Sequence, residues 1–277
     1  MTVREAIRSG ENQLASAGIE SASLDAQLLL GHLLDLPHLE LWLKQSEALT
    51  QAQADKYSLL LDRRSAREPL QHITGWTSFL RLSLHVNRDV LIPRPETEAL
   101  AQAAIEHLRL RPEPIAVLDW GTGSGCLALA LANGIPSASV VAVDASPDAL
   151  RIARANAIAH RLADRIRFVE GRGFDALRHR NGDRPLPDRF DAVVTNPPYI
   201  PTAEISSLQP EVQHHEPRLA LDGGPDGLDC FRELAAQAPS WLKPGGLLLA
   251  EVGDDQAPAL RELFGLHGWT PVLSEKD

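Results

Sequence analysis

The stretch "IAVLDWGTGSGCLALALANGI", from Ile115 to Ile135, decides the fold of this chain. Its first six residues form an apolar run that is typical of a buried strand. Glycines follow at 121, 123 and 125, where a backbone without side chains can turn tightly and approach a ligand closely. The apolar segment that begins at Cys126 predicts a helix, whose first turn presents free N–H groups to that ligand.

The same alternation of strand and helix continues along the rest of the chain. We expect further strands at residues 138–144, 165–171, 190–196 and 245–252, separated by helical segments such as residues 147–160. This pattern predicts an α/β fold with a doubly wound, mostly parallel sheet covered by helices on both faces. Ligands bind such sheets at the carboxyl ends of the strands, so the chemistry is expected directly after each strand.

The spacing of the glycines separates two kinds of nucleotide site. A dinucleotide fingerprint, G-x-G-x-x-G, needs its third glycine at position 126, which is Cys126 here. The spacing instead resembles the D-x-G-x-G-x-G loop of class I S-adenosylmethionine-dependent methyltransferases. The second expected strand ends at Asp144, about twenty residues beyond the glycines, where a carboxylate can accept hydrogen bonds from both ribose hydroxyls.

A second motif, "TNPPYI" from Thr195 to Ile200, ends the apolar run "FDAVV". Two prolines stop the strand rigidly, because neither has an N–H for the sheet, and they hold Asn196 and Pro197 in extended geometry. The Asn196 side-chain oxygen and the Pro197 carbonyl can then face the same space, beside Tyr199. Two fixed acceptors and an aromatic ring predict a socket for a planar –NH2 group on an sp2 carbon.

Upstream of the alternating region, the sequence predicts two other parts. Residues 1–72 show helical periodicity without strand signals, and Thr50 and Gln53 have capping-box spacing at the start of a helix that we expect to end at Pro69. Residues 73–93 alternate like a β-hairpin. We therefore expect a helical N-terminal substrate-recognition domain (1–72), a hairpin linker (73–93) and a methyltransferase domain (94–277).

The net charge and the cysteine content indicate which kind of partner the protein binds and in which cellular compartment it works. A formal net charge of −10 argues against a protein that binds mainly by neutralising phosphates, so nucleic acid is disfavoured. Two cysteines fit a reducing cytosol, and the sequence has neither a signal peptide nor a membrane-spanning segment. We expect a cytoplasmic protein that does not bind membranes.

Several stretches together resemble one family, the HemK/PrmC-type glutamine methyltransferases, which act on peptide chain release factors. The resemblance covers nearly the whole chain and rests on "EPLQHITG" (68–75), "VLIPRPETEAL" (90–100), "VLDWGTGSG" (117–125), "VTNPPYI" (194–200), "EPRLALDGGPDGLD" (216–229) and "LKPGGLLLAEVG" (242–253). It implies transfer of a methyl group from S-adenosylmethionine to the glutamine side-chain nitrogen of the Gly-Gly-Gln motif, with S-adenosylhomocysteine as the product.

The resemblance also implies roles for individual residues. It assigns cofactor binding to Gly121, Thr122, Gly123, Ser124, Gly125, Asp144 and Asn196, catalysis to Asn196, Pro197 and Tyr199, and substrate binding to Asn196, Pro197, Pro198 and Tyr199. Within "PRPETE", Glu96 and Thr97 are further expected contacts. We expect that methyl transfer needs no metal and no strong general base, because the amide nitrogen can lose its proton after it has been methylated.

The sequence departs from the family pattern at two places. After the third expected strand, Arg172 and Gly173 stand where the family places an acidic residue and a Trp or Leu against the adenine, so Gly173 and Phe174 become the expected contacts. At the end of the chain, the family continues into a final antiparallel strand that is absent here. We therefore expect residues 270–277 to be poorly paired.

Other functions remain open on the sequence alone. Adenine amino-methyltransferases of DNA or RNA use a motif similar to "NPPY", and sister enzymes that methylate a ribosomal-protein glutamine share both core motifs. "PRPETE" favours release factors over ribosomal proteins. A nicotinamide oxidoreductase is disfavoured by the glycine spacing, and a non-catalytic release-factor-binding module by the intact "NPPY".

Overall fold

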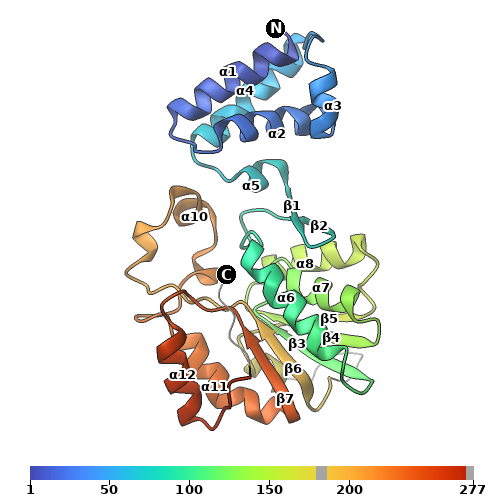
Figure 1. Ribbon diagram of the computed structural model, residues 1–277, viewed down its shortest axis with the longest axis vertical. Helices are drawn as coiled ribbons and strands as arrows, with labels where there is room; N and C mark the ends of the chain where they lie inside the picture. The colour runs from blue at the N-terminus through green and yellow to red at the C-terminus, as the bar shows by residue number, and fades with distance from the viewer. Residues whose placement is uncertain (179–185, 273–277) are drawn as a thin grey trace. The chain divides into compact units, whose positions relative to one another are not determined.

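A computed structural model describes residues 1–178 and 186–272 (Figure 1). The chain divides into two compact units: a helical unit of residues 1–76 and 209–215, and a sheet unit of residues 77–208 and 216–277. The chain therefore passes from the sheet unit into the helical unit after Leu208 and returns at Glu216. The substrate-recognition role predicted for residues 1–72 stays a prediction.

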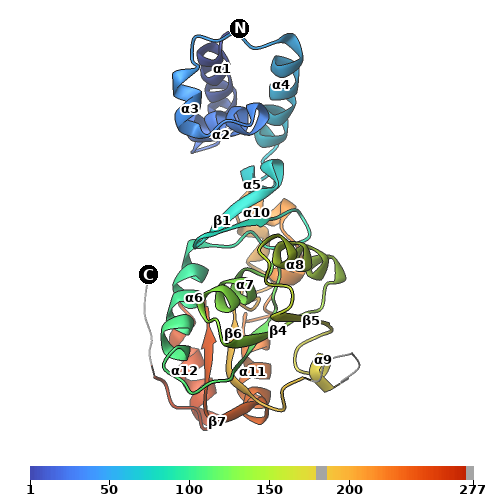
Figure 2. The same ribbon diagram turned by 90° about the vertical axis from the view of Figure 1, so that its right-hand side faces the viewer.

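Short and medium helices make up the helical unit (Figure 2). They are α1 (Val3–Ser16), α2 (Ala22–Leu34), α3 (His38–Leu43), α4 (Gln51–Ser65), α5 (Leu70–Thr74) and α10 (Pro210–His215), which comes much later in the sequence. The apolar faces of α1 to α5 share one core, which includes Leu14, Leu29, Leu30, Leu41, Tyr57 and Leu61. The Tyr57 hydroxyl donates to the Ala26 carbonyl at 2.9 Å, so its polar end is satisfied inside this core.

The start of α4 agrees with the sequence and its end does not. The capping box is present, since the Thr50 side chain accepts from the Gln53 N–H while the Gln53 side chain accepts from the Thr50 N–H. The predicted end at Pro69 is wrong: α4 stops at Ser65, and Arg67 turns the chain with a positive φ of 69°. Pro69 instead precedes α5, where the lack of an N–H costs nothing.

The predicted hairpin is confirmed. Strands β1 (Trp76–Phe79) and β2 (Leu82–His85) form a two-stranded sheet. A turn follows it, in which the Asp89 N–H donates to the Asn87 side chain at 2.9 Å.

The sheet unit is built on five strands in the order β5-β4-β3-β6-β7, with parallel pairing throughout the described residues. The strands are β3 (Ile115–Trp120), β4 (Ala138–Asp144), β5 (Ile166–Glu170), β6 (Phe190–Thr195) and β7 (Leu242–Ala250). Every residue of the central strands β3 and β6 is buried, which explains their continuous apolar runs. The predicted doubly wound α/β fold is confirmed.

Helices cover the two faces of this sheet (Figure 1). One face packs against α6 (Pro95–Leu108), α7 (Cys126–Gly134) and α8 (Pro147–Ala159), and its core includes Val117, Leu129 and Val140. The other face packs against α9 (Asp175–Arg178), α11 (Asp229–Trp241) and α12 (Ala257–Leu266), around Leu118, Phe174 and Phe231. Two 3-10 turns, Ile205–Ser207 and Arg218–Ala220, lie in the segment between β6 and α11.

The predicted tail falls partly outside the described residues. Residues 270–272 form no strand, and residues 273–277 are not among those described. The expectation of a poorly paired tail therefore stays a prediction. Within residues 1–178 and 186–272, no helix combines the length and apolar character that crossing a membrane requires.

Candidate active site

The carboxyl ends of four neighbouring strands bring the candidate residues together. Asp144 ends β4, the glycine turn follows β3, and Asn196 follows β6. Thr195 and Ala250 are partners in the ladder, so Asn196 and Glu251 leave the sheet side by side, and the Glu251 N–H donates to the Thr195 carbonyl at 3.1 Å. Because the strands are parallel, residues that are more than 100 positions apart in the sequence lie together at the carboxyl end of the sheet.

The glycine turn after β3 has a conformation that side chains rarely tolerate. Gly121, Gly123 and Gly125 have φ values of 80°, 54° and 85°. A Cβ on Gly121 or Gly123 would meet nothing within 4 Å, whereas one on Gly125 would lie 2.8 Å from Leu129. Gly125 therefore serves helix packing, and the first two glycines border open space that suits a close-lying ligand.

Asp144 supports this turn and keeps capacity for a ligand. One carboxylate oxygen accepts from the Gly123 N–H at 2.8 Å, and the other accepts from the Ser146 N–H at 2.8 Å. Burial raises the pKa of this carboxyl, although these backbone hydrogen bonds oppose the rise. A carboxylate has about four acceptor positions, so two remain for the two hydroxyls of a ribose.

Asp119 is a buried acid beneath the turn. One oxygen accepts from the Thr122 hydroxyl at 2.6 Å and from the Ala128 N–H at 3.0 Å. The other oxygen is buried and has no hydrogen-bond partner. Burial raises the pKa of Asp119 to about 7.

The side chain of Asn196 is oriented by a chain of hydrogen bonds. The Thr97 hydroxyl donates to one Glu251 carboxylate oxygen at 2.6 Å. Because that hydrogen is committed, the Thr97 oxygen acts as an acceptor, and the Asn196 –NH2 group donates to it at 3.0 Å. The nitrogen side of the Asn196 amide is thereby fixed toward Thr97, which leaves its oxygen available to a substrate.

Tyr199 is tied to the same carboxylate. Its hydroxyl donates to the second Glu251 oxygen at 3.1 Å, and its carbonyl accepts from the Gln256 side chain at 2.8 Å. Burial and the nearby Glu251 charge raise the pKa of Tyr199. The Tyr199 side chain is half-buried, and Pro197 is buried.

Glu251 was missed by the sequence reasoning, although it joins Thr97, Asn196 and Tyr199. Burial raises the pKa of its carboxyl, while the hydrogen bonds from Thr97 and Tyr199 lower it. A signal was present, because Glu251 directly follows the strand β7, where the chemistry was expected. Thr97 does lie in the site, in the first turn of α6, whereas Glu96 is exposed.

The expected contact between the Phe174 ring and adenine is wrong for this conformation. The ring has no exposed surface and packs between Trp120 and Trp241, with centroid distances of 6.3 Å to both. Gly173 has a φ of 54°, and a Cβ there would meet the Glu233 carboxylate at 2.0 Å. This pair therefore fills the core between the sheet and α11, and a cofactor contact at Gly173 stays a prediction.

The remaining sequence predictions concern groups near the site. Cys126 is partly buried, and burial raises the pKa of its thiol to about 12, so this cysteine is not an activated thiol. Among the described residues, no three His, Cys, Asp or Glu side chains are grouped so that they could hold a metal ion.

Comparisons with known proteins agree with this geometry. Residues 5–75 match the model of the PrmC N-terminal domain, and residues 97–213 match that of the methyltransferase small domain. The release factor glutamine methyltransferase of Geobacter sulfurreducens is 41% identical over 276 residues, which cover 100% of this chain and 93% of that protein. The enzyme of the same name from Moorella thermoacetica is 43% identical over 95% of this chain and 89% of its own.

This chain belongs to the release factor glutamine methyltransferase family. It is accordingly a methyltransferase, and its methyl donor is S-adenosylmethionine. The open glycine turn and the spare acceptors of Asp144 fit that cofactor.

One solved structure shows the shared fold. The hMettl16 catalytic domain superposes with a TM-score of 0.53 at 15% identity, covering 81% of this chain and 75% of its own. The release factor-specific protein-(glutamine-N5) methyltransferase of Alicyclobacillus acidocaldarius is 32% identical, with a TM-score of 0.38 over 66% of this chain and 83% of its own.

Removal of the Asp144 carboxylate should weaken the cofactor site. We expect Asp144→Ala to lose about 1–3 kcal/mol of S-adenosylmethionine binding free energy, the scale of hydrogen bonds to a charged group. Titration calorimetry measures this, with Asp148→Ala as a control because that side chain is 63% exposed on the following helix. Unchanged affinity in folded Asp144→Ala would remove Asp144 from the site.

The raised pKa of Asp119 should make stability depend on pH. The folded protein keeps a proton on this carboxyl up to about pH 7, whereas an ordinary Asp has a pKa of 3.8. The stability contributed by Asp119 is therefore lost as the pH rises through about 7. We expect the melting temperature of cofactor-free protein to fall between about pH 5 and pH 7, and to fall less in Asp119→Asn. Equal pH slopes for the two proteins would contradict the raised pKa.

Proposed function

We propose that this protein transfers the methyl group of S-adenosylmethionine to the side-chain amide nitrogen of the glutamine in the Gly-Gly-Gln motif of peptide chain release factors. The observation that carries the proposal is the fixed orientation of Asn196, whose –NH2 group is engaged by Thr97 at 3.0 Å. An amide held in this way offers an oxygen, and an oxygen acceptor is what a substrate –NH2 requires.

The residues of the site act by holding the nucleophile. S-adenosylmethionine supplies a methyl group on a positively charged sulfur, which is already activated for transfer. The Asn196 oxygen and the Pro197 carbonyl accept the two N–H bonds of the substrate amide, and the Tyr199 ring lies against its plane. These three groups fix the direction of the nitrogen toward the methyl group.

The same acceptors compensate for the low nucleophilicity of an amide nitrogen. Its nitrogen shares its lone pair with the carbonyl, and the barrier of about 18–20 kcal/mol to C–N rotation measures that conjugation. Positive charge develops on the nitrogen during transfer, so hydrogen bonds to Asn196 and Pro197 strengthen in the transition state. Because Glu251 holds Thr97 and Tyr199 from both of its oxygens, little reorganisation is needed at that moment.

A protein substrate is favoured over a nucleic acid. An adenine amino group is also –NH2 on an sp2 carbon, so the socket alone does not separate the two. The net charge of −10 opposes a polyanionic substrate, and the relatives that match along the whole chain are named for release factors. Release factors work in the cytoplasm, and we place this protein there as well.

The function is tested by offering the protein alternative substrates. A release factor, a ribosomal protein and an adenine-containing oligonucleotide are incubated with the protein and S-adenosylmethionine, and the products are mapped by mass spectrometry. We expect one methyl group on the Gly-Gly-Gln glutamine and none after that glutamine is replaced by glutamate, because a carboxylate offers no N–H to either acceptor. Faster methylation of the ribosomal protein or of adenine would reject the proposal.

Asn196 should be needed for turnover but not for cofactor affinity. We expect Asn196→Ala to lower kcat by roughly 10²–10³, the loss seen when one hydrogen-bonding group for the transition state is removed. Calorimetry with S-adenosylmethionine should give nearly wild-type affinity. Tyr199→Phe serves as a comparison and should be milder than Tyr199→Ala, since packing against the amide needs the ring more than the hydroxyl. Full activity in Asn196→Ala is the contrary result.

A further inference from the structure

The segment that follows the active-site motif forms a closed excursion, here called the strap (residues 200–222). Its two ends are joined directly after Tyr199: the Ile200 N–H donates to the Leu221 carbonyl at 3.0 Å, and the Gly223 N–H donates to the Ile200 carbonyl at 2.9 Å. Both ends of the strap therefore lie next to the backbone segment that carries the candidate catalytic residues.

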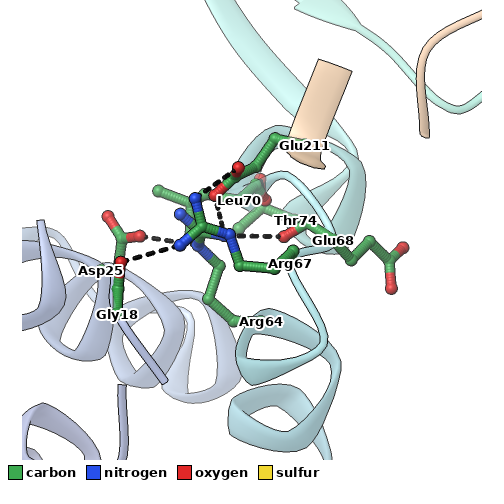
Figure 3. A network of polar contacts seen from close by, with 8 residues as sticks. All are labelled: Gly18, Asp25, Arg64, Arg67, Glu68, Leu70, Thr74 and Glu211. Carbon is green, nitrogen blue, oxygen red and sulfur yellow. Dashed lines mark hydrogen bonds and ion pairs between the residues drawn. The ribbon is translucent and has the colours of Figure 1, made fainter. Parts of the chain in front are cut away.

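The middle of the strap belongs to the helical unit. Figure 3 shows two arginines from α4 and the turn after it converging on Glu211 of α10. Arg64 donates to one Glu211 oxygen at 2.9 Å, and Arg67 donates to the other at 2.8 Å. Arg64 also donates to Asp25 at 2.8 Å.

This cluster is balanced in charge and largely shielded from water. It pairs two guanidinium groups with two carboxylates, and the side chains of Arg64, Asp25 and Glu211 are only 8%, 6% and 15% exposed. Burial opposes ionisation of Glu211, but its hydrogen bonds with Arg64 and Arg67 hold its pKa below the usual range. The ion pairs are therefore intact at neutral pH.

Shielded ion pairs of this kind specify position more than they add stability. The cost of removing charges from water offsets most of their attraction, yet loss of one partner leaves the others uncompensated. No residue of α10 is buried, so apolar packing does little to hold this short helix in the helical unit. Glu211 thus decides where the middle of the strap lies.

The strap is also held at Glu216, just beyond α10. Its carboxylate accepts from Arg94 at 2.6 Å and, within the sheet unit, lies 3.4 Å from the Ile92 N–H. Arg94 is the N-cap residue of α6, whose first turn carries Thr97. The strap consequently touches the active site through Tyr199 at one end and through the start of α6 near the other.

We propose that the cluster of Arg64, Arg67 and Glu211 holds the strap as part of the surface that docks the protein substrate, which makes Glu211 a positioning residue for the substrate protein and not for methyl transfer. This inference rests on the proposed function. The substrate glutamine that reaches Asn196 and Tyr199 is part of a release factor. The surface of the release factor around that glutamine meets the residues that follow Tyr199 in the enzyme, and those residues form the strap.

Steady-state kinetics with an intact release factor test the proposal. We expect Glu211→Gln to raise the KM for the release factor roughly tenfold, since an arginine pair loses its carboxylate, while kcat stays within about twofold. The Kd for S-adenosylmethionine should not change. Glu262→Gln is the matched control, because it removes the same charge from an exposed position on α12, outside the strap, and should leave KM unaltered.

A second pair of variants separates positioning from loss of folding. Arg67→Gln should raise KM like Glu211→Gln, and the double variant should be no worse than the more affected single variant, because both remove the same ion pair. Arg67→Lys keeps the charge and should recover most of the wild-type KM. The proposal is overturned if both single variants keep the wild-type KM, or if kcat falls by as large a factor as KM rises. If the wild-type protein does not methylate release factors, the proposed function fails first and this inference falls with it.

Discussion

The arrangement of the active site depends on one hydrogen bond, in which Asn196 donates its –NH2 group to the Thr97 oxygen at 3.0 Å. An amide side chain can present either a donor or an acceptor to a ligand, and the two choices suit opposite substrates. Thr97 accepts only because its own hydrogen is given to Glu251 at 2.6 Å. The half-buried carboxylate of Glu251 therefore orients the Asn196 amide through the Thr97 hydroxyl, so that the proposed substrate meets the amide oxygen.

The parallel sheet makes this relay possible. β6 and β7 are neighbours in register, so Asn196 and Glu251 emerge together, and α6 delivers Thr97 to the same edge. The glycine turn and Asp144 occupy the ends of β3 and β4 in the same sheet. The groups proposed to hold cofactor and substrate thus follow adjacent strands. Of these strands, β3 and β6 are buried along their whole length and leave the groups little freedom to move.

Much of this could be predicted from the sequence, because the signals were local. Apolar runs gave the strands, the spacing of Gly121, Gly123 and Gly125 gave the turn, and the paired prolines gave the rigid motif after β6. The relay through Glu251 depends on strand order, which the sequence does not state, although its place after β7 was a usable signal. Phe174 was misjudged because an aromatic residue after a strand can serve either a ligand or the core, and packing against Trp120 decides for the core. The contact between Glu211 and Arg67 joins positions 144 apart, and no local pattern indicates it.

The orientation of Asn196 is tested most directly by removing the Thr97 hydroxyl at constant shape. Thr97→Val leaves the Asn196 nitrogen without its acceptor and the Glu251 oxygen without its donor, each a loss on the order of 1–3 kcal/mol. The account predicts that kcat for release-factor methylation falls about tenfold to a hundredfold, that S-adenosylmethionine affinity is unchanged, and that Thr97→Ser retains most of the activity. A wild-type kcat in Thr97→Val would contradict it.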